Sequence, residues 1–200
     1  MINENNESSE WCENVILVDG DYIDRVAFDL TVNFERMIGR PIPKADLAHW
    51  IECIALDGGV RESGNTVQVF FLHSKNKSSL EYFKPSHYET DLHKMAFKDK
   101  LGEFSLSSYA TEDMISKDDF FIQSLELIIH AEGVKRVMVI PDAEKIYNNV
   151  REKLNDLNDE SKRITVFAMQ PMPGGNFRQE ILGYSLMSAL GISADEINKN

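Results

Sequence analysis

Residues 14–21 read Asn-Val-Ile-Leu-Val-Asp-Gly-Asp, and they decide the fold class of this 200-residue chain. The run 15–18 is aliphatic on both faces, as in a strand that is covered on both sides of its sheet. It stops at Asp19-Gly20-Asp21, and a pattern of apolar residues three and four apart follows over 22–38, which predicts a helix. A buried strand that ends in carboxylates and leads into a helix is typical of α/β proteins with a site above the sheet.

The same alternation of strand and helix continues along the chain. Further strands are expected at 66–73, 104–110, 136–140 and 164–169, and helices at 43–57, 87–100, within 111–132 after an N-cap at Ser116, within 146–157, and at 177–190. Strands that alternate with helices predict a parallel sheet with helices on both faces. We therefore expect a three-layer α/β sandwich around a central, mostly parallel five-stranded sheet. It forms a single domain at 14–192, between a flexible N-terminus (1–13) and a C-terminal tail (193–200).

Composition restricts the partners of the chain. The net charge is −12, from 21 basic against 33 acidic residues, so the average field repels nucleic acid and anionic membranes. A nucleic-acid substrate would need a local basic groove or bridging cations. The apolar runs are too short to span a bilayer, and the start has no signal-peptide pattern. Cys12 and Cys53 lack metal-ligand spacing and suit reduced thiols, so we expect a cytoplasmic protein with no membrane association.

Acidic residues follow several of the predicted strands. Because the carboxyl ends of parallel strands meet at one edge of a sheet, up to six carboxylates could converge there: Asp19, Asp21, Asp118, Asp119, Asp142 and Glu144. Closely packed like charges repel each other, and a hard divalent cation with oxygen ligands, Mg²⁺ or Mn²⁺, would neutralise them. Such an ion could activate water and stabilise an anionic phosphoryl transition state.

Each of these residues also has a purely structural interpretation. Asp118 and Asp119 would suit a helix N-terminus, Asp21 could cap the first helix, and Glu144 lies in a predicted first turn. His73 could be a ligand or proton carrier, or simply packed. The lysines of the next loop, Lys75 and Lys77 among them, could contact phosphates or form a solvated face.

The order of elements and acids resembles the NYN branch of the PIN-like nuclease superfamily. The resemblance covers about 15–190 and rests on Asp19-Gly20-Asp21 after the first strand, Lys117-Asp118-Asp119 on the helix before the fourth, and Asp142-Ala143-Glu144 after it. It implies a parallel α/β sandwich and a metal-dependent ribonuclease that uses Mg²⁺ or Mn²⁺. By position, the resemblance makes Asp19, Asp119 and Asp142 the catalytic metal acids, with Glu144 and Asp21 as auxiliary ligands. Lys117, Lys75 and Lys77 would bind the RNA substrate.

The sequence departs from the family pattern at two of these motifs. Tyr22 replaces the Asn that usually follows the first Asp by three residues, and Ile140-Pro141 replaces Ser-Gly before the later acids. Glu144-Lys145 stands where the family has Asp-Phe. Pro141 also removes a backbone N–H that could have contacted a phosphate. The pattern is therefore also consistent with a member that binds without cutting, or with an uncharacterised bacterial group of the superfamily.

A second enzyme class shares the first motif. Asp19-Gly20-Asp21 resembles the first motif of haloacid-dehalogenase-type phosphatases, in which the first Asp is the nucleophile. Ser74 is the only candidate for the hydroxyl that such enzymes carry after the second strand, and the sequence does not identify their lysine. A homodimer through 74–100 or through the last helix is a further arrangement that the sequence leaves open.

Overall fold

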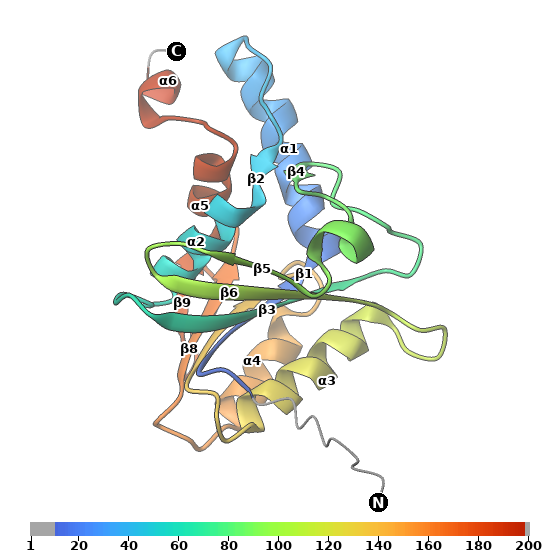
Figure 1. Ribbon diagram of the computed structural model, residues 1–200, viewed down its shortest axis with the longest axis vertical. Coiled ribbons are helices and arrows are strands. Elements are labelled where there is room, and N and C mark those ends of the chain that lie inside the picture. Colours follow the sequence, from blue (N-terminus) through green and yellow to red (C-terminus); the bar gives the residue numbers. More distant parts are fainter. Residues whose placement is uncertain (1–10, 199–200) are drawn as a thin grey trace, which may run out of the picture.

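The computed structural model describes residues 11–198, which contain a seven-stranded sheet in the order β5-β6-β3-β1-β7-β8-β9 (Figure 1). The strands are β1 (Asn14–Asp19), β3 (Asn65–His73), β5 (Met95–Lys98), β6 (Gly102–Ala110), β7 (Arg136–Ile140), β8 (Arg163–Ala168) and β9 (Arg178–Ile181). Every neighbouring pair is parallel except β5 with β6. A separate two-stranded sheet joins β2 (Ala45–Asp46) to β4 (Phe83–Lys84).

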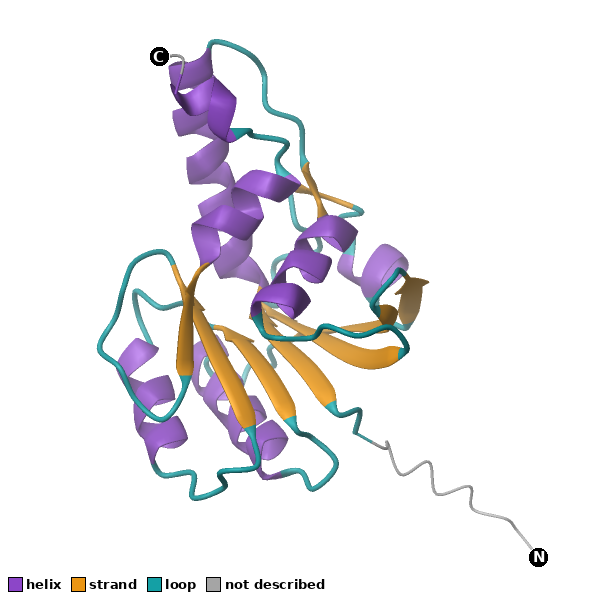
Figure 2. Cartoon of the chain, turned by 90° about the vertical axis from the view of Figure 1, so that its left-hand side faces the viewer, coloured by secondary structure: helices purple, strands orange, loops and turns teal. Residues whose placement is uncertain are grey.

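Helices cover both faces of the sheet, as Figure 2 shows. They are α1 (Gly20–Ile38), α2 (Leu47–Asp57), α3 (Lys117–His130), α4 (Tyr147–Asn155), α5 (Leu182–Ala189) and α6 (Ala194–Asn198), with a single π-helical turn, η1 (Tyr88–Leu92). Core residues of α1, α2 and α5 pack on one face of the sheet, and those of α3 and α4 pack on the other. The expected α/β architecture, with a mainly parallel central sheet between two layers of helices, is confirmed.

The central position of β1 sets the place of the candidate site. Val18 lies opposite Phe71 of β3 on one side and Ile140 of β7 on the other. The carboxyl ends of these three parallel strands therefore share one edge of the sheet. We call it the acidic edge, because Asp19 ends β1, Asp21 follows two residues later, and Asp142 comes after β7.

The five predicted strands all form and all run parallel, but the sheet has two further strands, β5 and β9, at its edges. The predicted helix at 87–100 is wrong: only the turn η1 forms there, and Met95–Lys98 pairs with β6 as an antiparallel edge strand. The predicted helix at 177–190 begins too early, because Arg178–Ile181 forms β9 and α5 starts at Leu182. Both strands are short and largely solvent-exposed, so they lack the apolar run that identifies a buried strand.

Two terminal segments, 1–13 and 193–200, were expected to lie outside the domain. Most of the expected flexible segment 1–13 lies outside the described residues. At the other end, α6 falls within the expected tail, and Arg40 Nε lies 2.7 Å from Glu196 Oε1 in a salt bridge that joins α6 to the segment after α1. No helix within the described part of the chain is long and apolar enough to cross a membrane.

Candidate functional site

Asp19 is the last residue of β1 and the N-cap of α1. Its Oδ1 accepts a hydrogen bond from the backbone N–H of Tyr22 at 3.0 Å, so the strand passes directly into the helix. The same oxygen accepts a hydrogen bond from Lys117 Nζ at 2.7 Å. The side chain of Asp19 is only 1% exposed, so the charge pair with Lys117 is largely shielded from water.

Asp21 lies in the first turn of α1 and faces the segment that follows β3. Its Oδ2 accepts hydrogen bonds from the backbone N–H of Ser74, at 3.1 Å, and from the Ser74 hydroxyl. Lys117 Nζ lies 3.6 Å from the same oxygen. The ammonium group of Lys117 therefore lies between the carboxylates of Asp19 and Asp21.

Each of these two carboxylates keeps one oxygen without a partner. Among the residues that the structure describes, Asp19 Oδ2 and Asp21 Oδ1 are buried and make no hydrogen bond. Burial raises the pKa of Asp19 above its usual value, although the charge of Lys117 and its hydrogen bond act in the opposite direction. A buried acceptor that lacks a donor costs about 1–3 kcal/mol. A cation bound at either oxygen would supply the missing partner.

Asp142 follows β7 and is bound by cationic side chains. Its buried carboxylate lies 3.3 and 3.4 Å from Arg25 Nη2 and 3.6 Å from Lys145 Nζ, while Glu144 lies 3.1 Å from the same Arg25 nitrogen. Burial disfavours the charge of Arg25, but Asp142 and Glu144 raise its pKa overall. Burial and the charges of Glu144 and Asp142 also raise the pKa of Tyr22 to about 12.

Asp119 has the structural role that the sequence left open. Its backbone N–H donates to Ser116 Oγ at 3.0 Å, and its own Oδ2 accepts from the Ser116 hydroxyl at 2.7 Å. Its side chain is exposed, while that of Asp118 in the same turn is half-buried. Ser116 is the N-cap of α3, as predicted.

Within residues 11–198, no group of three or more His, Cys, Asp or Glu side chains is arranged so that it could hold a metal ion. The structure therefore does not assemble Asp19, Asp119 and Asp142 into one ligand set. Asp19 and Asp21 share Lys117 as a partner, and each carboxylate has one oxygen that is unpartnered among the described residues. This pair fits Mg²⁺, which proteins commonly bind through one or two carboxylates while the ion keeps several waters.

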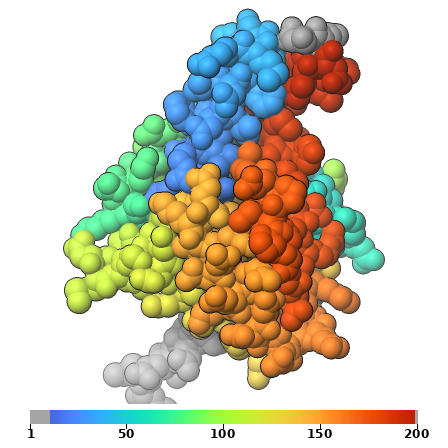
Figure 3. Space-filling view, turned by 180° about the vertical axis from the view of Figure 1, so that it is seen from behind, coloured from blue at the N-terminus to red at the C-terminus, as the bar shows by residue number. Residues whose placement is uncertain are grey.

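The loop 74–84 forms one wall of the acidic edge. In Figure 3 its green surface adjoins the blue of α1, and the light orange surface that follows β7 lies on the other side of α1. Asp24 of α1 fixes this loop, because its carboxylate accepts hydrogen bonds from the backbone N–H groups of Glu81 and Tyr82 at 3.0 and 2.8 Å. Lys77 lines two cavities here, of about 430 and 520 Å³, of which the smaller is also lined by Asp21 and Arg25.

Lys75 and His73, the other residues predicted at this edge, each have a partner within the protein. Lys75 forms an exposed salt bridge with Asp113, with Nζ and Oδ2 2.8 Å apart. His73 is buried, and its ring stacks on that of Tyr88 with centroids 3.7 Å apart. Burial lowers the pKa of His73 below its usual value.

Sequence reasoning missed Arg25 as a member of the site. It lies four residues after Asp21 and three after Tyr22, so its side chain neighbours each of theirs on α1, and that spacing was the available signal. Its guanidinium carbon lies 5.3 Å from the centre of the Tyr22 ring. The contact with Asp142, 117 residues away, depends on the pairing of β1 with β7.

Comparison with known proteins gives a family but no activity. The family described as "Family of unknown function (DUF6621)" matches residues 8–197. No curated protein and no solved structure matches the chain.

Proposed function

The chain belongs to the DUF6621 family, and we propose that it is a divalent-cation-dependent endoribonuclease whose site is the acidic edge. The observation that carries the proposal is the pair of buried oxygens, Asp19 Oδ2 and Asp21 Oδ1, that have no partner among the described residues. The resemblance to NYN nucleases supports RNA as the substrate. Of the acids that this resemblance selects, Asp19 and Asp21 are the better-placed ligands. The carboxylate of Asp119 already accepts a hydrogen bond from the hydroxyl of Ser116.

Asp19 and Asp21 would hold Mg²⁺ or Mn²⁺, and the bound ion would lower the pKa of a water and offset charge on the phosphoryl oxygens. Lys117 already contacts both acids and could turn toward a substrate phosphate when an ion neutralises them. Arg25 and Lys77 line the adjacent cavity together with Asp21, Asp24 and Glu81. Because Arg25 binds Asp142 and Glu144, Lys77 would be the main cation for the backbone of a bound RNA.

Thermal unfolding with and without Mn²⁺ or Mg²⁺ tests the metal site directly. An ion at a hundredfold excess over its Kd should stabilise the fold by about 2.7 kcal/mol. Asp21→Asn should remove this stabilisation. Asp29→Asn, which removes an exposed charge from the same helix, should keep it.

Mn²⁺-dependent cleavage of a labelled single-stranded RNA, lost in Asp21→Asn and kept in Asp29→Asn, would complete the test. If neither metal raises the melting temperature, the acidic edge is an interaction surface with its acids neutralised by Lys117 and Arg25.

The second candidate is a phosphatase in which Asp19 is the nucleophile. Two contacts favour it: Ser74 binds Asp21, and Lys117 binds Asp19, so a hydroxyl and a lysine both adjoin the first motif. Against it, Asp19 is fully buried, and its Oδ1 already accepts two hydrogen bonds. Hydrolysis of an aryl phosphate with Mg²⁺, lost in Asp19→Asn and unaccompanied by RNA cleavage, would establish this alternative.

A further inference from the structure

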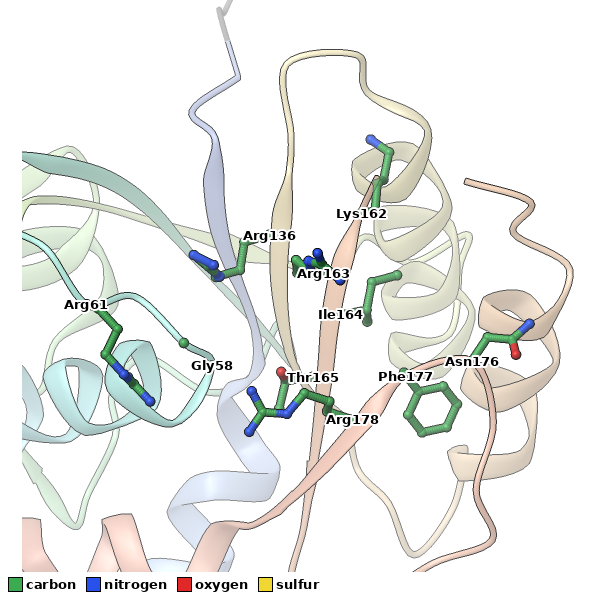
Figure 4. A pocket seen from close by; sticks show the side chains of 11 residues that line it. Gly58, Arg61, Arg136, Lys162, Arg163, Ile164, Thr165, Asn176, Phe177 and Arg178 are labelled. Atoms are coloured by element: carbon green, nitrogen blue, oxygen red, sulfur yellow. The ribbon is translucent and has the colours of Figure 1, made fainter. Parts of the chain in front are cut away.

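Arginines are concentrated at the edge of the sheet opposite the acidic edge. Arg136, Arg163 and Arg178 are the first residues of β7, β8 and β9, and Arg61 belongs to the segment after α2. All four line a cavity of about 510 Å³, shown in Figure 4. We call it the arginine cavity. The chain has a net charge of −12, so this cavity is a local region of positive charge in an acidic protein.

The arrangement is electrostatically unfavourable when the cavity is empty. Arg136 and Arg163 are direct neighbours across β7 and β8, where like charges destabilise the pairing. Arg136 Nε is also buried and makes no hydrogen bond among the described residues. Burial, together with the charges of Arg163, Arg61 and Arg178, lowers the pKa of Arg136. An anion placed among these groups would relieve both the repulsion and the missing hydrogen bond.

Nearby acceptors compensate for only part of this charge. Arg61 donates to the carbonyls of Leu56 and Val60 near the end of α2, where the helix dipole favours cations. Arg178 forms a salt bridge with Glu180, with Nη2 and Oε1 3.0 Å apart.

Asp57 also faces this cluster, and burial, together with the charge of Glu180, raises its pKa overall, although Arg61 and Arg178 act in the opposite direction. Lys162 also lines the cavity, and its Nζ donates to the carbonyls of Ala131 and Val134, in the segment between α3 and β7. Among the described residues, four arginines and Lys162 line the cavity, while the carboxylates of Asp57 and Glu180 interact with Arg61 and Arg178 from outside its lining.

The remaining lining suits an organic group attached to the anion. Gly59 has a φ of +93°, and a Cβ there would lie 3.7 Å from Arg136 Nε, so glycine leaves the approach to this guanidinium open. Thr165 lies beside Arg178 in the sheet register. Asn176 and Phe177, from the loop before β9, line another part of the cavity (Figure 4). An amide and an aromatic ring are suitable contacts for a nucleobase.

We propose that the arginine cavity binds a free nucleoside di- or triphosphate, with its phosphates on the arginines and its base near Asn176 and Phe177. Guanidinium groups match phosphate geometry through paired hydrogen bonds, and the volume is within the range of small-molecule sites. The site lies at the other end of the strands from Asp19. It is therefore independent of the proposed nuclease site.

Isothermal titration of the purified chain with ATP, GTP, inorganic triphosphate and adenosine, in metal-free buffer, tests the proposal. ATP or GTP should bind and adenosine should not. Arg163→Gln, an exposed position, should weaken nucleotide binding about tenfold, as expected for the loss of a hydrogen bond between charged groups. Arg36→Gln removes an exposed charge at the end of α1 and should leave binding unchanged. Equal binding by these two variants would overturn the proposal.

Two further comparisons by the same titration identify the chemical class of the ligand. Phe177→Leu should weaken binding of ATP or GTP while binding of inorganic triphosphate persists. If triphosphate binds wild-type protein as tightly as either nucleotide, the assignment of a nucleoside is wrong. A short RNA that binds through Arg163 while free nucleotides do not would also contradict it. Mn²⁺ stabilisation of Arg163→Gln, measured in parallel, reports on the acidic edge separately.

Discussion

Lys117 and Asp19, 98 residues apart in the chain, form a charge pair with Nζ and Oδ1 2.7 Å apart at the carboxyl end of the central strand. The ammonium group lies 3.6 Å from Asp21 Oδ2 as well, so it already offsets the negative charge that would attract a metal ion to the two unpartnered oxygens. A lysine there neutralises the site when no metal is bound. Lysine and metal would then compete for the same two acids.

Replacement of Lys117 by Met should separate these roles. Without the ammonium group, Asp19 becomes a buried, uncompensated carboxylate, so the metal-free protein should lose about 3–5 kcal/mol of unfolding free energy. Mn²⁺ should restore part of this loss and should stabilise the variant more than it stabilises wild type. Urea unfolding with and without Mn²⁺ measures both effects. Equal Mn²⁺ stabilisation of variant and wild type would contradict competition at Asp19 and Asp21.

Arg25 should stabilise the fold through Asp142. Arg25→Gln leaves the buried Asp142 carboxylate with Lys145 as its remaining cationic partner, at 3.6 Å. Because the Arg25 side chain is 40% exposed and its contacts are long, the expected loss is about 1–3 kcal/mol. Urea unfolding measures it. Arg36→Gln, an exposed position on the same helix, is the matched control and should change the unfolding free energy by no more than about 0.5 kcal/mol.

The sequence was sufficient for the centre of the sheet but not for its edges. Runs such as 15–18 and 137–140 are apolar on both faces, and this pattern occurs mainly in strands covered by helices on both sides. Arg178–Ile181 is exposed or half-buried and forms a strand because β8 offers a free edge beside it. That neighbour is a tertiary feature, and no local pattern in four residues encodes it.

The candidate site was predictable in its location and less so in its contacts. Parallel strands place Asp19 and Asp142 at one edge, which sequence reasoning derived. Which cation neutralises each acid depends on where long side chains reach after the layers have packed, as Arg25 does across to Asp142. Arg136 and Arg163 stand at or just before the starts of predicted strands, but Arg178 falls in a stretch predicted to be helical, so the arginine cavity depends on the register of β7, β8 and β9.

His73 should make stability fall as the pH is lowered. Its pKa in the folded protein is below the unfolded value of about 6.5, so the unfolded state takes up a proton first as the pH falls through that value. Nearby Asp21 opposes this effect without reversing it. The contribution should be at most about 1.4 kcal/mol per pH unit. His73→Phe keeps a ring against Tyr88 and removes the titrating group, so the decrease between pH 7.5 and 5.5 should be smaller than in wild type. An unchanged pH slope in urea unfolding would contradict the prediction.

Gly20 and Tyr88 should be energetically coupled. A Cβ at Gly20 would lie 2.3 Å from the Tyr88 hydroxyl oxygen and 3.3 Å from the carbonyl of Leu72, so Gly20→Ala must displace the Tyr88 ring. That ring is 2% exposed and stacked on His73, so it has little room to move. The expected loss of unfolding free energy is about 1–3 kcal/mol, the usual cost of overpacking.

The double variant decides whether this contact is the cause. Tyr88→Phe removes the hydroxyl that the new methyl group would meet, so Gly20→Ala should cost less when combined with Tyr88→Phe than in the wild-type protein. A double-mutant cycle by urea unfolding should give a coupling energy of about 0.5–3 kcal/mol, as found for residues in direct contact. Additive costs would place the strain elsewhere, at the backbone of Leu72. Gly20 separates Asp19 from Asp21, so a displaced α1 start would also alter their shared contact with Lys117, and Mn²⁺ stabilisation in the same four proteins would report it.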